Sequence, residues 1–168
     1  EDNALYSLVD NWLFYPHIYR NATANQDARG VYTYLGQYPD FSMRYAARSP
    51  YGVSSYQLSI PATESGQTIS IYFPEIDIAS EIWLDDTLVA SNGNVKTAPI
   101  KARIQNTVIT FSTEKTHTLY VIAANDTHYY SGMYYPCILS TPQGIQSMIL
   151  RKVLFYGFLV FSSLSIGL

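Results

Sequence analysis

Apolar and polar residues alternate along the middle of this chain, in runs that end at a proline. Residues 51–60 form one such run, which Pro61 ends, and residues 68–73 form another, which Pro74 ends. Alternation with a period of two predicts strands that bury one face, and proline is rarely found inside a sheet. The apolar positions are Val53, Tyr56, Leu58 and Ile60 in the first run and Ile69, Ile71 and Phe73 in the second.

Shorter runs of the same kind predict further strands at residues 12–15, 80–84, 87–90, 107–111, 118–123 and 134–139. Residues 80–84 and 87–90 should pair as a hairpin around Asp85 and Asp86. Asn92-Gly93-Asn94 is expected to form a turn, because Asn and Gly tolerate positive φ. Residues 31–45 are expected to be irregular. About nine short strands at a spacing of roughly 8–12 residues, without amphipathic helices between them, predict an all-β fold, either a β-sandwich or a jelly roll.

The end of the chain has a different pattern. Arg151 and Lys152 precede sixteen residues without a charge, residues 153–168. A spanning helix needs about 20 apolar residues, so this segment is interpreted as the start of a first transmembrane helix. The alternative is an amphipathic or buried segment of the same domain. We therefore expect a β-sandwich domain at residues 1–148 and a membrane junction at residues 149–168, with Arg151 and Lys152 at the headgroups.

The amino-acid composition makes some classes of function less plausible than others. Charged residues make up only 14% of the 168 residues, whereas Tyr occurs 16 times. Tyr suits strands and half-buried faces, and its ring can stack on sugars or partner proteins. The net charge of -3 without a basic cluster argues against nucleic acid. The single cysteine, Cys137, excludes an internal disulfide and a Cys-based zinc site and is expected in the core.

Several stretches carry a resemblance to a known family: YGVSSY (51–56), FPEIDIAS (73–80), IWLDD (82–86), LVASNG (88–93), NDTHYYSG (125–132) and QGI (143–145). With these stretches the chain resembles the extracytoplasmic sensing domain of bacterial seven-transmembrane receptors with diverse intracellular signalling modules. Two positions depart from that pattern: Asp85-Asp86 stands where Asn-Gly is common, and Tyr129-Tyr130 replaces the Arg often found after the histidine.

The resemblance implies a galactose-binding-like jelly roll followed at once by the first membrane span. It implies the periplasmic domain of a bacterial inner-membrane protein, which serves as the ligand-binding input of a signalling receptor. The ligand expected is a carbohydrate or a similar small polar molecule, and a homodimer stays open. Two other functions stay open as well: a non-catalytic carbohydrate-binding module of a secreted glycosidase, and a sandwich that binds another protein.

The residues at 125–132 are the first candidates for ligand binding. Asn125 and His128 can donate and accept hydrogen bonds, while Tyr129 and Tyr130 offer ring faces to a polyhydroxylated ligand. In the alternative interpretation Asn125 forms an Asx-turn and the tyrosines cover the edge of the core. Trp83 is either a stacking platform or a core residue, and Asn92 either lines the same rim or only shapes a turn.

Catalytic chemistry is not expected. Glycoside hydrolysis needs two facing carboxylates, and the pairs at Glu75 with Asp77 and at Glu81 with Asp85 or Asp86 lack any sign of a pocket. The three histidines have no metal-ligand spacing, and no Gly-x-Ser-x-Gly nucleophile elbow occurs. We therefore expect no enzyme activity, no cofactor and no catalytic metal, while a structural Ca²⁺ held by backbone carbonyls with Asp77 or Asp126 stays open.

Overall fold

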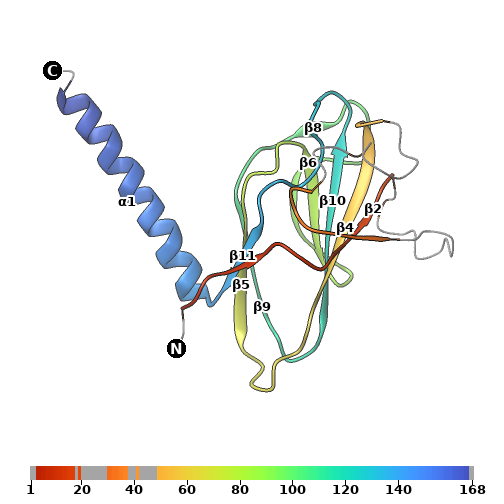
Figure 1. Ribbon diagram of the computed structural model, residues 1–168, viewed down its shortest axis with the longest axis horizontal. Coiled ribbons are helices and arrows are strands. Elements are labelled where there is room, and N and C mark those ends of the chain that lie inside the picture. Colours follow the sequence, from red (N-terminus) through yellow and green to blue (C-terminus); the bar gives the residue numbers. More distant parts are fainter. Residues whose placement is uncertain (1–2, 18, 20–29, 38–40, 42–48, 167–168) are drawn as a thin grey trace.

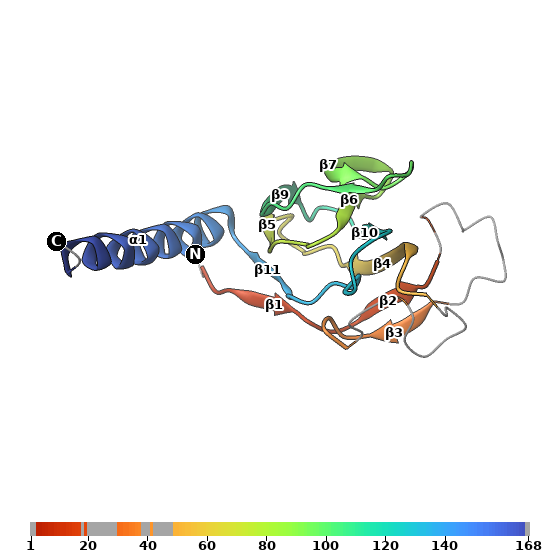
Figure 2. The same ribbon diagram turned by 90° about the horizontal axis from the view of Figure 1, so that it is seen from above.

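The computed structural model describes residues 3–17, 19, 30–37, 41 and 49–166. Two antiparallel sheets face each other (Figures 1 and 2). The smaller sheet has the order β1 (Tyr6–Leu8), β11 (Cys137–Ser140), β5 (Thr68–Phe73) and β9 (Thr107–Ser112). The larger sheet has the order β3 (Val31–Thr33), β2 (Trp12–Tyr15), β4 (Gly52–Ile60), β10 (His117–Asn125), β6 (Ala79–Leu84), β7 (Thr87–Asn94) and β8 (Lys101–Ala102).

The core fills the space between the sheets because alternate residues of nearly every strand are apolar. Ile71 and Phe73 on β5 face Ile82 on β6 and Leu119 and Val121 on β10, and all five are almost completely buried. Truncating one of these side chains to Ala typically costs about 2–5 kcal/mol. The two faces of the sandwich are therefore fixed by the two-residue period of the sequence.

The predicted fold class, an all-β jelly-roll sandwich with an apolar C-terminal helix, is confirmed. The strands predicted at 12–15 and 68–73 have the observed bounds, and the other predicted strands overlap observed ones. Leu84 pairs with Thr87 across Asp85 and Asp86, so the predicted hairpin is also confirmed. The prediction missed β1, β3 and β8, which contain only two or three residues each and are too short to show a period.

Two local predictions need correction. Val31–Thr33 forms β3 within the stretch expected to be irregular, residues 31–45, of which 38–40 and 42–45 lie outside the described residues.

Asn92, Gly93 and Asn94 do not form a turn but continue β7, where Gly93 pairs with Ala102. Gly93 has φ 108°, and a Cβ there would collide with the backbone of residues 101–103, so glycine permits a close strand contact instead. The turn begins after Asn94, whose Oδ1 accepts hydrogen bonds from the N–H of Lys96 (3.1 Å) and of Thr97 (3.3 Å).

Helix α1 (Pro142–Ile166) follows β11 after one residue, Thr141. Thr141 caps it, since its Oγ1 accepts a hydrogen bond from Gly144 N–H at 3.1 Å, and Pro142 suits the first helical position. The predicted boundary between residues 148 and 149 therefore lies inside a continuous helix.

The first three turns of α1 pack on the sandwich and the remainder does not. Ile145 is buried, and Lys152 Nζ lies 4.9 Å from the centroid of the Tyr72 ring on β5. From Val153 to Ser165 nearly every side chain is exposed, most of them large and apolar. By length and composition the 24 residues of Pro142–Ser165 could cross a membrane, and Figure 1 shows α1 projecting away from the sheets.

Candidate ligand-binding site

The loop after β10 is organised by Asn125, which is only 3% exposed. Its Oδ1 accepts hydrogen bonds from the N–H of His128 (2.8 Å) and of Thr127 (3.3 Å). Its Nδ2 donates to the carbonyl of Pro50 at 3.1 Å and to the carbonyl of His128. This is the Asx-turn of the alternative interpretation, so the Asn125 amide shapes the loop and is already fully engaged within the protein.

Aromatic rings cluster on the loop that Asn125 holds. The ring centroids of Tyr129 and Tyr130 lie 5.0 Å apart, and Tyr130 lies 6.5 Å from His128 and 5.8 Å from Tyr134. Tyr129 is 69% exposed and Tyr130 is 48% exposed. We call His128, Tyr129, Tyr130 and Tyr134 the loop cluster. It presents ring faces and hydroxyl groups to solvent on a fixed backbone, which is chemically suited to stacking on a sugar.

His128 adds an oriented polar group to the loop cluster. Its Nδ1 lies 3.0 Å from the carbonyl oxygen of Tyr130, which can only accept a hydrogen bond. In the neutral ring Nδ1 therefore carries the proton, and Nε2 is left as an acceptor for a ligand hydroxyl.

Trp83 lies elsewhere, on the outer face of the larger sheet. Its indole N–H donates to Glu81 Oε2 at 3.0 Å, and the Tyr19 hydroxyl donates to the same oxygen at 2.7 Å. Lys96 Nζ lies 3.8 Å from Glu81 Oε1. Burial and the hydrogen bond to Glu81 raise the pKa of Tyr19. Because Trp83 also packs against a small buried cluster that includes Val95 and Ile122, it is held as a half-buried structural ring.

Asn92 lies in the interior and is 2% exposed. Its Nδ2 donates to Thr107 Oγ1 at 3.2 Å, and its Oδ1 accepts a hydrogen bond from Gln105 Nε2 at 2.7 Å. These bonds connect β7 to the start of β9, across the edge of the sandwich. A ligand could reach the Asn92 amide only by displacing them.

The six predicted site residues therefore occupy three places. Asn125, His128, Tyr129 and Tyr130 share one loop, whereas Trp83 and Asn92 lie on opposite faces of the larger sheet. The sequence analysis missed Tyr134 as a member of the loop cluster and Glu81 as the partner of Trp83. The spacing of two between Glu81 and Trp83 on a strand was a usable signal, because such residues share a face.

The metal-binding and nucleophilic candidates give no second site. Within the described ranges no three His, Cys, Asp or Glu side chains gather as a metal site. Cys137 is fully buried, and burial raises the pKa of its thiol far above the usual range, as expected of a core residue. Burial alone would raise the pKa of Asp85, but hydrogen bonds from Thr118 N–H, Lys115 and His117 lower it to about 2.

The fold has close counterparts among solved structures. The chain aligns over 81% of its length with a putative beta-galactosidase from Bacteroides fragilis, at a TM-score of 0.60 and 14% identity. It aligns over 82% with a GH2 beta-galacturonidase from Eisenbergiella tayi (TM-score 0.57, 15% identity) and over 83% with a Faecalibacterium prausnitzii beta-glucuronidase (TM-score 0.54, 17% identity).

These likenesses concern a part of each enzyme. The chain spans 23%, 24% and 31% of the three enzyme chains, respectively. A scan of family models and a search of curated proteins find no match. At this level of identity the likeness establishes the fold, a β-sandwich of the kind found in GH2 glycosidases.

Proposed function

We propose that this chain is the non-catalytic, ligand-binding input domain of a membrane receptor, located on the outer side of a bacterial inner membrane. The observation that carries the proposal is the short, packed connection between β11 and α1. The apolar helix α1 follows β11 after one residue, packs on the sandwich for three turns and presents exposed apolar side chains from Val153 onward. A flexible linker would uncouple the domain from the helix, whereas a rigid joint can pass a change in the domain on to it.

The loop cluster supports a neutral carbohydrate as the ligand. Its rings and hydroxyl groups are exposed, its backbone is fixed by Asn125, and it carries no formal charge when His128 is neutral. The likeness to glycosidase sandwich domains supports the same class of ligand. Binding would favour one arrangement of the sandwich relative to α1 and so alter the membrane segment.

The proposal is tested by measuring glycan binding and helix response on one sample. The chain is reconstituted in phosphatidylcholine nanodiscs and probed with an array of neutral and anionic oligosaccharides. We expect a neutral glycan to bind, and the double variant Tyr129→Ala, Tyr130→Ala to lose at least about tenfold in affinity, because each stacked ring contributes roughly 0.5–1.5 kcal/mol beyond its buried area. Tyr32→Ala, an exposed tyrosine on β3, is the matched control and should bind as the wild type does.

A label on α1 then separates reception from binding alone. Because Cys137 is fully buried, a single introduced cysteine, Ser163→Cys, can carry a spin label selectively. We expect the bound glycan to change the mobility of the label or the distance between labels, and the tyrosine double variant to abolish that change. Glycan binding with an unchanged label would contradict a receptor role.

The second candidate is a non-catalytic carbohydrate-binding module of a secreted glycosidase. The observation that favours it is the structural likeness to parts of GH2 enzymes. It predicts glycan binding without a response in α1, and a catalytic domain in the sequence past Leu168 where a receptor has further apolar spans. A sandwich that binds another protein predicts no glycan binding at all.

A further inference from the structure

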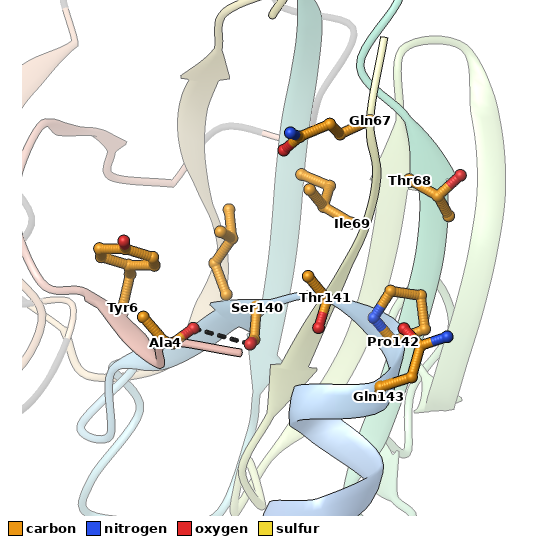
Figure 3. A pocket seen from close by; sticks show the side chains of 10 residues that line it. Ala4, Tyr6, Gln67, Thr68, Ile69, Ser140, Thr141, Pro142 and Gln143 are labelled. Carbon is orange, nitrogen blue, oxygen red and sulfur yellow. Dashed lines mark hydrogen bonds between the residues drawn. The ribbon is translucent and has the colours of Figure 1, made fainter. Parts of the chain in front are cut away.

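A cleft lies where the sandwich meets α1, far from the loop cluster. It has a volume of about 590 Å³ and is lined by Ala4, Tyr6, Gln67, Thr68, Ile69, Leu139, Ser140, Thr141, Pro142 and Gln143 (Figure 3). The Gln67 backbone joins Thr113, before the start of β10, whereas the loop cluster follows the end of β10 at Asn125. The length of β10, about 26 Å at the usual strand rise, separates the two regions. The volume is within the range of small-molecule sites, about 300–1,000 Å³.

The wall of this cleft nearest to α1 is fixed by hydrogen bonds. Ser140 Oγ donates to the carbonyl of Ala4 at 2.7 Å, which Figure 3 marks with a dashed line. The hydroxyl of Thr141 lies 2.6 Å from Asn3 Oδ1 while it caps the helix. Strand β11, the segment before β1 and the first turn of α1 are therefore tied together, and their polar groups are already used.

Three other polar side chains around the cleft have no side-chain hydrogen bond to any residue that the structure describes. Among the described residues, none makes a side-chain hydrogen bond to the Tyr6 hydroxyl or to the amides of Gln67 and Gln143. Tyr6 pairs with Leu139, which pairs with Ile71, and Gln67 lies four residues before Ile71 on the same strand path. The two-residue period of a strand therefore places Tyr6 and Gln67 on the same face of the smaller sheet.

The chemistry of these groups defines the class of ligand. Each amide can donate and accept hydrogen bonds, and Tyr6, which is 56% exposed, adds a ring face and a hydroxyl. Ile69 and Leu139 supply apolar surface beneath them. None of the ten lining residues carries a charge, so neither an anion nor a cation is favoured. We propose that this cleft binds a neutral, polyhydroxylated small molecule, such as a mono- or disaccharide.

A free sugar and the sugar headgroup of a glycolipid share this chemistry, and the position of the cleft favours the free sugar. Gln143 precedes Arg151 by eight residues, which is roughly 12 Å along the helix. The headgroup layer on each side of a bilayer is only about 5–8 Å thick. With Arg151 and Lys152 at the headgroups, the cleft opens to water beyond the lipid.

The consequence for signalling rests on the proposed function, although binding itself does not. The lining of the cleft includes residues of β1 and β5 and the first residues of α1, so a bound ligand would lie against both parts. Its affinity would therefore depend on the orientation of α1 relative to the sandwich. A ligand that binds one orientation more tightly than another shifts the population toward that orientation.

The test uses the full chain in phosphatidylcholine nanodiscs. Galactose, lactose, maltose and cellobiose are titrated and binding is followed by saturation-transfer NMR. We expect at least one of these sugars to bind, and Gln67→Ala and Gln143→Ala each to weaken its binding about fivefold, the effect of one lost hydrogen bond. Gln146→Ala, an exposed glutamine of α1 outside the cleft, is the matched control and should leave affinity unchanged, and thermal melts verify that each variant is folded.

The outcomes separate this site from the loop cluster. Binding that responds to Gln67→Ala and Gln143→Ala but not to Tyr129→Ala with Tyr130→Ala assigns the ligand to the cleft. The reverse pattern, or no binding by any of the four sugars, overturns the cleft proposal and leaves the loop cluster to its own test. A second experiment uses nanodiscs that contain the glycolipid digalactosyldiacylglycerol. Saturation transfer to its sugar headgroup, without binding of any free sugar, would overturn the assignment to a soluble ligand.

Discussion

Gly144, in the first turn of α1, lies tightly against the end of β11. A Cβ at this position would meet Ser140 Oγ and would lie 3.2 Å from the carbonyl oxygen of Asn3. Since Ser140 Oγ donates to Ala4, the added methyl group would also disturb the bond that holds the segment before β1. We expect Gly144→Ala to lower the free energy of unfolding by about 1–3 kcal/mol, although Ala favours a helix by about 1 kcal/mol.

Gly157 is the matched control for this measurement, because no atom lies within 4 Å of a Cβ built there. In thermal or urea melts in detergent, Gly157→Ala should be neutral or stabilising. Equal stability of the two variants would mean that α1 does not pack on β11 as described.

The candidate site could be predicted at the residue scale only where its contacts are local in sequence. Asn125 bonds to residues two and three positions ahead, and the Asx-turn was among the two interpretations of the sequence. Asn92 instead depends on Gln105 and Thr107, more than ten residues away, so its burial left no local signal. The cleft beside α1 also escaped prediction because Tyr6, Gln67 and Gln143 come together only through the sheet order.

The β6–β7 hairpin is held at its turn by Asp85. This carboxylate accepts hydrogen bonds from Thr118 N–H (2.9 Å) and from His117 Nδ1 (2.9 Å), and Lys115 Nζ lies at 3.1 Å. The backbone there has φ 52°, which Asp and Asn both tolerate. The hairpin was predictable from alternation alone, whereas this anchor to β10 was not, because it joins residues about 33 positions apart.

Replacing Asp85 by Asn should make the free energy of unfolding depend less on pH in the acidic range. The pKa of Asp85 is lowered from 3.8 to about 2, so its stabilising contribution is complete above pH 4 and is lost as the pH falls from about 4 through 2. We expect Asp85→Asn to cost roughly 1–2 kcal/mol at neutral pH, a figure reduced for its 31% exposure, and the difference from wild type to shrink below pH 4.

Melting temperature measured against pH on both proteins checks this prediction. Glu64→Gln, in the exposed loop between β4 and β5, is the control and should follow the wild-type profile at every pH. A constant difference between Asp85→Asn and wild type from pH 7 to pH 2 would contradict the assigned role of the carboxylate.

The molecule as a whole combines two parts that place their apolar residues differently. The sandwich buries its apolar residues between sheets, whereas the exposed part of α1 presents its own to the surroundings. The double variant Phe158→Lys, Phe161→Lys should lose retention in membranes after alkaline extraction, because each lysine near the centre of a spanning helix costs about 2.5–3.5 kcal/mol. The melting temperature of the sandwich should stay the same, because both side chains are exposed on the part of α1 that projects from it.

Phe158→Leu with Phe161→Leu keeps the apolar character and should stay in the membrane fraction. If the lysine variant were retained equally well, α1 would not be the element that anchors the chain. The sequence indicated this division, because charge disappears after Lys152. The start of the helix at Pro142 was missed although Thr141 followed by Pro142 is a local start signal, whereas the burial of Ile145 depends on the folded sheet.

The one-residue connection between β11 and α1 has a consequence for assembly. Each residue of an α-helix advances by about 100° around the axis and about 1.5 Å along it. One amino acid inserted after Thr141 would therefore turn every exposed apolar side chain of α1 by more than a quarter circle while shifting it little along the axis. The pairing of β11 with β5 therefore sets the direction in which each side chain of α1 points around the helix axis. Under the proposed receptor role, a neighbouring helix would meet the side of α1 that this register selects.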